Sequence, residues 1–392
     1  MNTAILTNEI QGFINDNLKT DVHKIILSKQ KFTKVSQKEL VEQIESKLKS
    51  KSKLPTWFNT QNIYYPNKLN LSQTSSEITA NYKASLVNGK SLVDVTGGFG
   101  VDSFAFCKKI KEVVHIEKNE TLSQIARYNF NQLGISNITC IATNGLTFLQ
   151  ESPNTFSWLY IDPSRRDKEN KKVYYLSDCE PNVIEHMDLL LVKSSNLLIK
   201  TGPLLDLKSG LKELSHVKEI HIVAVNNDVK EILWLIEKGF NSEAFIKTVN
   251  FKPNYKQEFC FRLSDEENTI PEYSEPLTYI YEPNAAILKS GSFQFTGDHF
   301  NLYKLHPHAH LYTSEKLIEF PGRVFIVKDI YEYSKKAIKK AGISKANITT
   351  RNFPDSIEKI RKKLQIKDGG DNYIFCTTNK YEKLIVISCF QI

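Results

Sequence analysis

The chain has 392 residues, of which 41% are hydrophobic and 24% are charged, as is typical of folded globular proteins. Its 16 Gly and 13 Pro are too few for a collagen-like or low-complexity chain. No apolar run approaches the ~18 residues that a membrane-spanning helix needs, and the N-terminus lacks the pattern of a secretory signal. The six cysteines form no CxxC pair. We therefore expect a cytoplasmic protein with no membrane attachment, disulfide scaffold or metal site.

The net charge of +8 is concentrated at the two ends of the chain. Residues 1–55 carry ten Lys against six acidic residues, and residues 321–392 carry fifteen Lys and Arg against seven. The middle of the chain is therefore slightly acidic. Basic ends around an acidic body indicate regions that bind a polyanion such as RNA in a salt-dependent way. Solvated lysine-rich surfaces would give the same pattern.

The first part of the chain is predicted to be helical. Apolar residues recur at steps of three and four over residues 1–50, which is typical of amphipathic helices. Residues 56–72 are rich in aromatic residues, Asn and Pro, and we expect a loop there. A further helix opens near Thr74, because Glu77 follows three residues later, as in a capping box.

From residue 91 onward, short apolar strands alternate with helices. The predicted strands cover residues 91–95, 112–117, 138–142, 156–161, 196–200, 219–225 and 259–263. The predicted helices cover residues 104–110, 121–133 and 229–238. Repeated β-α-β units predict an α/β fold with a doubly wound, mostly parallel sheet. Right-handed crossovers would bring the carboxyl ends of the strands to one rim, where ligands bind.

A change of composition marks the end of this α/β region. Residues 264–276 are acidic and poor in core residues, and we interpret them as a linker. Two small α+β units follow. The predicted domains are an N-terminal helical region over 1–72, an α/β domain over 73–265, and small α+β domains over 277–320 and 321–392.

The strongest motif is DVTGGFGVDS, residues 94–103, directly after the first predicted strand. Its glycines, Gly97, Gly98 and Gly100, allow a tight turn close to a ligand. Asp94 could bind an amine, and Glu117, at the end of the next strand, could accept both hydroxyl groups of a ribose. Amine, carboxylate and ribose together point to S-adenosylmethionine. The alternative is NAD, because the glycine spacing departs from GxGxxG only at its last position.

Three further residues complete the predicted cofactor site. Asp102 belongs to the glycine motif itself. Asn144 follows the third strand, where a side chain could bond the adenine amino group. Glu77 lies on the helix before the first strand, together with Lys83, and could touch the methionine end of the cofactor. Ordinary loop and capping roles would explain Asn144 and Glu77 equally well.

The segment YIDPSRR, residues 160–166, follows the fourth strand. Here the sequence resembles class I S-adenosylmethionine-dependent methyltransferases, whose nucleic-acid N-methylating members carry a [D/N]-P-P-[aromatic] motif. By this resemblance, Asp162 and the backbone carbonyl that follows it would accept hydrogen bonds from the target amine, and Pro163 matches the motif. Ser164 and Arg165 depart from it. Arg165 would instead orient the acceptor through a phosphate or carboxylate, or pair with a nearby acid.

The resemblance extends to a narrower family. Its motifs are residues 74–84, 94–103, 161–167, 177–181, 199–200 and 225–227. These are similar to bacterial methyltransferase-like proteins with a C-terminal THUMP-like domain. The resemblance implies a Rossmann-like class I methyltransferase domain, S-adenosylmethionine as cofactor, a ferredoxin-like unit over 277–320 and a THUMP-like domain over 321–392.

The same resemblance implies a substrate class. THUMP domains bind RNA in RNA-modifying enzymes, so tRNA or rRNA is the implied substrate. Two alternatives stay open: a methyltransferase for a small molecule or protein, and an RNA-binding or assembly factor without catalysis.

Two other features have a weaker connection to function. Cys179 follows Asp162 by 17 residues and could be the nucleophile of carbon-5 pyrimidine methylation, although a lone Cys more often fills a core. The segment HPHAH, residues 306–310, could hold a metal if extended. No acidic or Cys cluster accompanies it, and we expect a structural role.

The basic residues of the C-terminal region fall on or near two predicted helices. They are Lys335, Lys336, Lys339, Lys340, Arg351, Lys359, Arg361, Lys362 and Lys363. Apolar residues at helical spacing would give each helix a core-facing side and leave these basic residues on the surface. Such a surface would bind RNA phosphates in a salt-dependent way.

Overall fold

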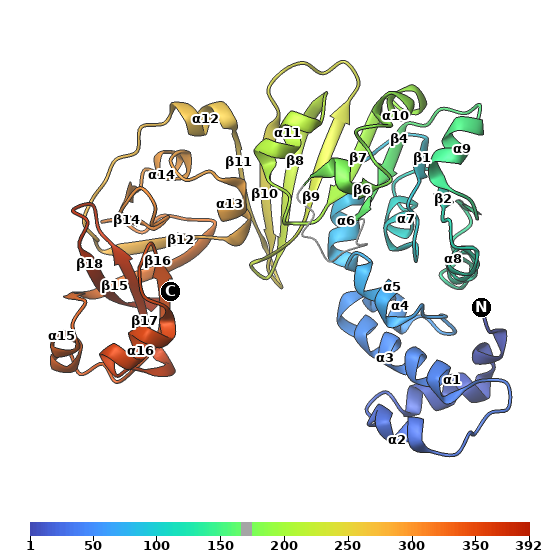
Figure 1. Cartoon of the computed structure of the whole chain (residues 1–392), viewed down its shortest axis with the longest axis horizontal. Coiled ribbons are helices and arrows are strands. Elements are labelled where there is room, and N and C mark those ends of the chain that lie inside the picture. The colour runs from blue at the N-terminus through green and yellow to red at the C-terminus, as the bar shows by residue number, and fades with distance from the viewer. Residues whose placement is uncertain (166–174) are drawn as a thin grey trace. The chain divides into compact units, whose positions relative to one another are not determined.

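A computed structural model describes residues 1–165 and 175–392 of the protein. The chain divides into two compact units (Figure 1). The first unit consists of Met1–Val217 and Trp234–Asn241, and the second of Lys218–Leu233 and Ser242–Ile392.

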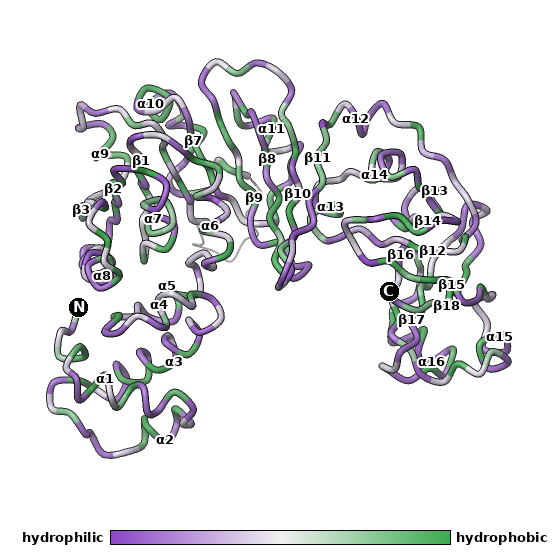
Figure 2. Tube along the Cα trace, turned by 180° about the vertical axis from the view of Figure 1, so that it is seen from behind, coloured by the Kyte–Doolittle hydropathy of each residue, from purple (hydrophilic) through white to green (hydrophobic). Residues whose placement is uncertain are grey.

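The first unit begins with amphipathic helices, as the spacing of apolar residues predicts. They are η1 (Thr3–Leu6), α1 (Asn8–Asp16), α2 (Val22–Leu27) and α3 (Gln37–Lys53). Hydrophobic and hydrophilic residues alternate along α3 (Figure 2), and Leu40 and Ile44 are buried. A capping box formed by Ser36 and Glu39 starts α3, because each side chain accepts a hydrogen bond from the other residue's backbone N–H.

The prediction of a loop over residues 56–72 is wrong in part, because two short helices lie there. They are α4 (Pro55–Asn59) and α5 (Lys68–Gln73). Proline is favoured at the first position of a helix, where its missing N–H costs nothing, and Pro55 occupies that position in α4. The fully buried Trp57 anchors α4 to the rest of the unit.

The next helix, α6 (Glu77–Ser85), begins two residues later than the capping-box prediction. Ser76 is the N-cap, and its hydroxyl accepts a hydrogen bond from the backbone N–H of Thr79 at 3.2 Å. Thr74 instead donates its hydroxyl to the carbonyl of Leu71. The residue type was correct for a cap, but the position was not.

Buried contacts attach the N-terminal helices to the α/β body. The ring of Trp57 packs against Phe99 with centroids 4.6 Å apart and against Phe104 of α7 (Val101–Phe106) at 5.7 Å. In α8 (Glu120–Gln132), the buried Asn129 binds both backbone groups of Tyr64. Its Oδ1 accepts from the Tyr64 N–H at 2.9 Å, and its Nδ2 donates to the Tyr64 carbonyl at 2.8 Å.

Five strands of the first unit pair in parallel within the nine-stranded sheet. They are β1 (Ser91–Asp94), β2 (Glu112–Ile116), β3 (Ile138–Ile141), β4 (Trp158–Ile161) and β7 (Asn196–Thr201). Their order is β3-β2-β1-β4-β7. The other helices of this part are α9 (Gly145–Glu151), η2 (Leu176–Asp178), α10 (Met187–Lys193) and α11 (Leu207–Glu213). The predicted parallel α/β fold is confirmed, with the carboxyl ends of these strands at one edge.

The prediction of a helix over residues 229–238 is wrong, because the chain forms strand β9 (Asp228–Glu237) there. It follows β8 (Val217–Val225) after a two-residue turn, in which Asn226 and Asn227 have φ of 51° and 66°. Asn tolerates this left-handed conformation, and two such residues suit a hairpin turn. The continuous buried run 232–236 also fits a strand that is covered on both faces.

In the second unit, β10 (Phe245–Phe251) pairs parallel to β8, and β11 (Lys256–Arg262) pairs antiparallel to β10. The predicted linker, residues 264–276, overlaps a short helix, α12 (Leu263–Asn268). Within residues 1–165 and 175–392, no helix has the length and hydrophobicity that crossing a membrane requires.

The rest of the second unit is a seven-stranded sheet with small helices. Its strands follow the order β13-β14-β12-β15-β18-β17-β16. They are β12 (Tyr279–Pro283), β13 (Tyr303–Lys304), β14 (Tyr312–Ser314), β15 (Gly322–Glu332), β16 (Lys345–Arg351), β17 (Lys367–Thr378) and β18 (Leu384–Gln391). The helices are α13 (Ala285–Ser290), α14 (Phe295–His299), α15 (Lys335–Lys340) and α16 (Ile357–Leu364). Ile338 and Ile360 of the last two helices are buried in a core with Ile374 and Val386 of the sheet.

We predict that Asn129→Ala destabilises the first unit. The substitution leaves the N–H and carbonyl of Tyr64 buried without a partner, and we expect the free energy of unfolding to fall by about 2–3 kcal/mol. Chemical denaturation followed by circular dichroism measures this change. Asn131→Ala, on the exposed side of the same helix, is the matched control and should stay within about 0.5 kcal/mol. Equal effects of the two substitutions would contradict the role of Asn129.

Candidate functional site

A cavity of about 900 Å³ lies at the carboxyl ends of the parallel strands. This volume is typical of sites for small molecules and cofactors. The loops that follow β1, β2, β3, β4 and β7 contribute to its wall, together with Asn70, Gln73, Thr74 and Ser75. Of the residues predicted from the sequence, Asp94, Gly97, Gly98, Gly100, Asp102, Glu117, Asn144 and Asp162 line it. Glu77 and Pro163 are not part of this lining.

The glycine loop after β1 fits tightly against its neighbours. Gly98 and Gly100 have φ of +58° and +89°, a conformation that side-chain-bearing residues rarely adopt. A Cβ atom on Gly97 would lie 2.2 Å from the ring of His115 in β2, and one on Gly100 would lie 2.4 Å from the ring of Phe130 in α8. The glycines are therefore required for packing as well as for the turn.

Asp94 is a buried carboxylate at the end of β1. Its Oδ2 accepts a hydrogen bond of 2.6 Å from the Ser103 hydroxyl, and its Oδ1 accepts one of 3.1 Å from the backbone N–H of Thr96. Burial raises the pKa of Asp94 to about 7, and the negative charges of Asp102 and Asp162 contribute to the rise. A cation placed beside Asp94 would relieve this unfavourable charge.

Glu117 lies at the end of β2, on the other side of the glycine loop. Its Oε2 accepts a hydrogen bond from the Gly98 N–H at 2.9 Å, and its Oε1 accepts one from the Asn119 N–H at 2.7 Å. These backbone donors fix the orientation of the carboxylate. Because each carboxylate oxygen has more than one lone pair, both oxygens retain the capacity to accept hydroxyl groups from a ligand.

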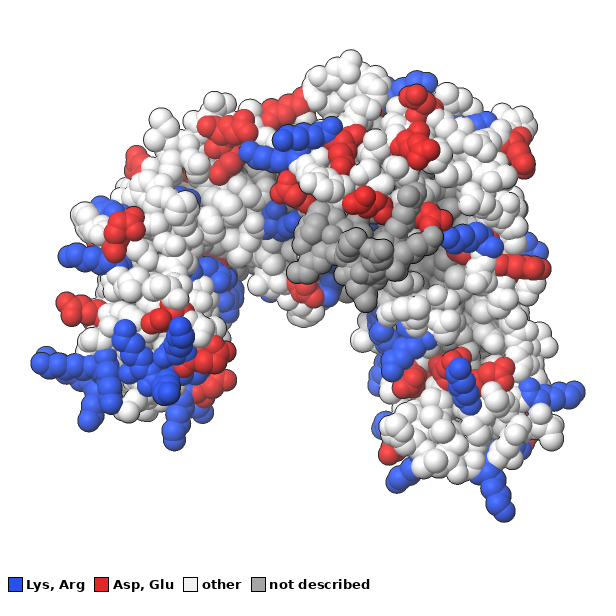
Figure 3. All heavy atoms as spheres, viewed as in Figure 1, with Lys and Arg blue, Asp and Glu red and all other residues white. Residues whose placement is uncertain are grey.

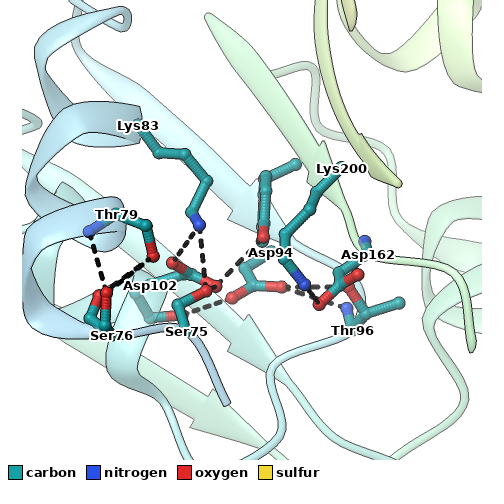
Figure 4. A network of polar contacts seen from close by, with 11 residues as sticks. Ser75, Ser76, Thr79, Lys83, Asp94, Thr96, Asp102, Asp162 and Lys200 are labelled. Carbon is teal, nitrogen blue, oxygen red and sulfur yellow. Dashed lines mark hydrogen bonds and ion pairs between the residues drawn. The ribbon is translucent and has the colours of Figure 1, made fainter. Parts of the chain in front are cut away.

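Asp102, in the first turn of α7, belongs to a network with buried polar groups (Figure 4). Its Oδ2 accepts from the hydroxyl groups of Ser75 at 2.8 Å and Tyr160 at 3.0 Å. Its Oδ1 lies 3.1 Å from the Nζ atom of the fully buried Lys83, which also donates to the Ser75 hydroxyl at 2.9 Å. Burial alone would raise the pKa of Asp102, but the ammonium groups of Lys83 and Lys200 outweigh burial and lower it.

The two weaker cofactor candidates have local structural contacts. The carboxylate of Glu77 accepts hydrogen bonds from the backbone N–H and the hydroxyl of Thr56, and so joins α6 to α4. Asn144 lines the cavity, but its Oδ1 caps α9 by accepting from the N–H groups of Leu146 and Thr147. The amide nitrogen of Asn144 is the part of this side chain that could bond a ligand.

Asp162, just after β4, is held on two sides (Figure 4). Its backbone N–H donates to the Thr96 hydroxyl at 2.8 Å, and its Oδ2 accepts from the Nζ atom of Lys200 at 2.5 Å. Lys200 is the second-last residue of β7 and also lines the cavity. Pro163 is buried behind Asp162 and does not line the cavity.

Arg165 belongs to the short strand β5 (Ser164–Arg165), which pairs with β6 (Cys179–Glu180). The predicted role of the Arg165 side chain lies outside the described residues. Cys179 is buried and does not line the cavity. None of the other five cysteines is part of the cavity wall either. The packing of Cys179 is therefore that of a core residue.

The histidines of residues 306–310 make structural contacts in the second unit. His306 is buried, with Nε2 bonded to Glu382 at 2.9 Å and Nδ1 bonded to the Asn352 amide at 3.0 Å. The ring of His310 stacks on Phe293 with centroids 3.7 Å apart. In the described part of the chain, no three His, Cys, Asp or Glu side chains are grouped to hold a metal ion.

Two cavity residues received no role from the sequence motifs. Thr96 connects Asp94 to Asp162, and Lys200 pairs with Asp162. One sequence signal points to Lys200: it is a charged residue near the carboxyl end of a buried apolar strand, at the edge where ligands bind a parallel sheet. No sequence signal points to Thr96 beyond its place in the glycine motif, because its hydrogen-bond partner Asp162 is distant in sequence.

Basic side chains gather on the surface formed by α15 and α16 (Figure 3). The residues concerned are Lys335, Lys336, Lys339, Lys340, Lys359, Lys362 and Lys363, all of which are exposed. Arg351 belongs to a different setting, because it forms an ion pair of 2.6 Å with the buried Glu282. The two helices thus present a positive face, as predicted, but Arg351 does not extend it as a free charge.

The raised pKa of Asp94 predicts a dependence of stability on pH. Because folding favours the protonated form of this carboxyl, its contribution to stability is complete below about pH 4 and is lost as the pH rises through about 7. We expect the thermal midpoint of the wild type to decrease, relative to that of Asp94→Asn, as the pH rises from about 4 to about 7. Differential scanning fluorimetry of both proteins measures this. A difference that is constant with pH would contradict the shift.

Comparisons with known proteins agree with this architecture. Residues 279–321 match the family model of a ferredoxin-like domain, and residues 322–390 match that of a THUMP domain-like family. No protein with a curated description matches the sequence. The chain is similar to a protein from Porphyromonas gingivalis W83 named "putative methyltransferase", with 29% identity, a TM-score of 0.88, and coverage of 99% of this chain and 98% of that one.

More distant structures match a smaller share of the chain. One is TrmK from M. capricolum in complex with S-adenosyl-homocysteine, with 16% identity, a TM-score of 0.33, and coverage of 42% of this chain and 70% of that one. Another is an rRNA methylase from Streptococcus thermophilus, with 17% identity, a TM-score of 0.31, and coverage of 42% and 98%.

The resemblance to methyltransferase-like proteins with a C-terminal THUMP-like domain is confirmed at the level of the fold and the C-terminal domains. The chain has a mixed α/β methyltransferase-like fold, shared over its whole length with the Porphyromonas gingivalis protein, and it ends in a ferredoxin-like and a THUMP-like domain.

Proposed function

We propose that the protein is an S-adenosylmethionine-dependent methyltransferase that acts on RNA. The observation that carries this proposal is the cavity at the strand ends, in which Asp94 and Glu117 stand on either side of a glycine loop. When bound, S-adenosylmethionine supplies a methyl group on a positively charged sulfur. The described residues provide complementary groups for the ammonium group, the ribose and the base of this molecule.

The donor set fits the cofactor. Asp94 is a buried acid with a raised pKa, and it would be stabilised by the ammonium group of the methionine part. Glu117, oriented by two backbone N–H groups, would accept the ribose hydroxyl groups. Asp102 also lines the cavity. Its buried Oδ1 is ion-paired with Lys83, but no described residue donates a hydrogen bond of good geometry to this oxygen. The amide of Asn144 would contact the base.

Asp162 would face the methyl acceptor. Its Oδ2 is bonded to Lys200, and no donor among the described residues bonds its Oδ1, which leaves that oxygen to accept an N–H from the acceptor. Pro163 would fix the backbone beside it, and Arg165 would orient the acceptor. A cysteine-dependent methylation of carbon is disfavoured, because no cysteine lines the cavity. A nitrogen acceptor is therefore the better candidate.

RNA is the proposed substrate because of the C-terminal region. The exposed lysines of α15 and α16 form a positive face on the domain that matches a THUMP-like family. Neutralising RNA phosphates with such side chains releases counterions, so binding should weaken as salt increases. The N-terminal lysines would add to this attraction.

Titration calorimetry with S-adenosylmethionine tests the cofactor. We expect saturable binding by the wild type and a loss of affinity of about tenfold or more for Glu117→Ala, because the ribose loses its charged acceptor. Glu120→Ala, which changes an exposed acid at the start of α8, should bind like the wild type. Absence of binding by the wild type would refute the proposal.

Mass spectrometry of nucleosides from wild-type and deletion cells tests the substrate. We expect one methylated nucleoside to disappear from the RNA of the deletion strain, and purified protein with S-adenosylmethionine to restore it. Binding of the cofactor with unchanged nucleosides would instead favour a methyltransferase for a small molecule or protein. RNA binding and cofactor binding without methyl transfer would favour a non-catalytic assembly factor.

A further inference from the structure

Five charged side chains belong to the polar network in the wall of the cavity (Figure 4). They are Asp94, Asp102, Asp162, Lys83 and Lys200. Thr96 connects Asp94 to Asp162. Each lysine forms an ion pair with one carboxylate: Lys83 with Asp102 at 3.1 Å and Lys200 with Asp162 at 2.5 Å.

The network has more acids than bases. Among the described residues of this network, three carboxylates face two ammonium groups, which leaves one negative charge in excess when all five are ionised. The other charged lining residues, Glu117, Glu180 and Lys118, add a further excess of one negative charge. Asp94 and Lys83 are buried, so these charges act through a medium that screens them weakly. The pKa of Asp94 is raised to about 7, mainly by burial and in part by the negative charges of Asp102 and Asp162, as expected where negative charge is not fully compensated.

The two ion pairs differ in their access to the cavity. The Lys83 side chain is 0% exposed and the Asp102 side chain is 13% exposed. Lys200 and Asp162 are 15% and 31% exposed, and both line the cavity. The Asp162–Lys200 ion pair is therefore the one whose charges would interact most directly with a bound ligand.

We propose that the excess negative charge makes this cavity select the methyl donor over its demethylated product, with Asp162 and Lys200 setting the degree of selection. The inference rests on the proposed function. S-Adenosylmethionine has a positively charged sulfur, whereas the sulfur of S-adenosylhomocysteine is neutral, and the two molecules otherwise have the same charged groups. A cavity wall with a net negative charge favours binding of S-adenosylmethionine and so promotes release of S-adenosylhomocysteine.

Removing either member of the pair should shift this selection in opposite directions. Asp162→Asn removes the excess negative charge, so the preference for a cationic ligand should fall about tenfold. Lys200→Met leaves a second uncompensated negative charge, so the preference should rise by a similar factor. A residue that only maintained the fold would not produce opposite signs in the two variants.

Titration calorimetry on the full chain tests this, at about pH 8, where Asp94 is ionised. The probes are S-adenosylmethionine, S-adenosylhomocysteine and sinefungin, which has a positively charged amine in place of the methylated sulfur. The quantity measured is the affinity for each cationic probe divided by that for S-adenosylhomocysteine. We expect wild-type ratios of about tenfold, which decrease at high salt.

The matched control is another ion pair of the protein, Lys247 with Glu258 at 3.0 Å, both 30% exposed. Lys247→Met and Glu258→Gln should leave the ratios unchanged. Ratios that move in the same direction in Asp162→Asn and Lys200→Met, or that do not move, would overturn the inference while leaving the cofactor assignment intact. If none of the three probes binds the wild type, the proposed function and the inference both fail.

Discussion

Burying a carboxylate is costly unless the protein supplies donors for it, and the cavity is organised around this requirement at Asp94. The donors are the hydroxyl of Ser103 and the N–H of Thr96, both from the loop and helix that directly follow the acid. Satisfying Asp94 therefore determines the path of the glycine loop. That path presses Gly97 against His115, so the wall of the cavity is set by packing before any ligand arrives, which lowers the cost of binding.

One threonine carries this arrangement to the next strand. Thr96 donates its N–H to Asp94 and accepts the N–H of Asp162 through its hydroxyl. The position of the acid after β4 is thereby tied to that of the acid after β1. In the proposed function, Asp162 would contact the methyl acceptor and Asp94 the methyl donor. A single residue, Thr96, would therefore fix the spacing of the two substrates. Such spacing matters for methyl transfer, which depends on orientation.

Local sequence patterns predicted the parts of the fold that depend on local physics. The glycine motif and the acids at strand ends were found because strand, turn and helix follow one another directly. The prediction of a helix at β9 is wrong, because its apolar run is compatible with both a helix and a strand. The hairpin turn at Asn226 is what makes this segment a strand. The partnership of Lys200 with Asp162 was missed because 38 residues separate them. Only the sheet brings them together.

The N-terminal helices have a consequence for comparisons among relatives. Asn70, Gln73, Thr74 and Ser75 line the cavity, and Trp57 packs on Phe99 of the glycine loop. This region is thus part of the pocket as well as of the exterior. A chimaera that exchanged the first 75 residues between two relatives would also transplant these four lining residues, so altered ligand preference in such hybrids would trace to the borrowed segment.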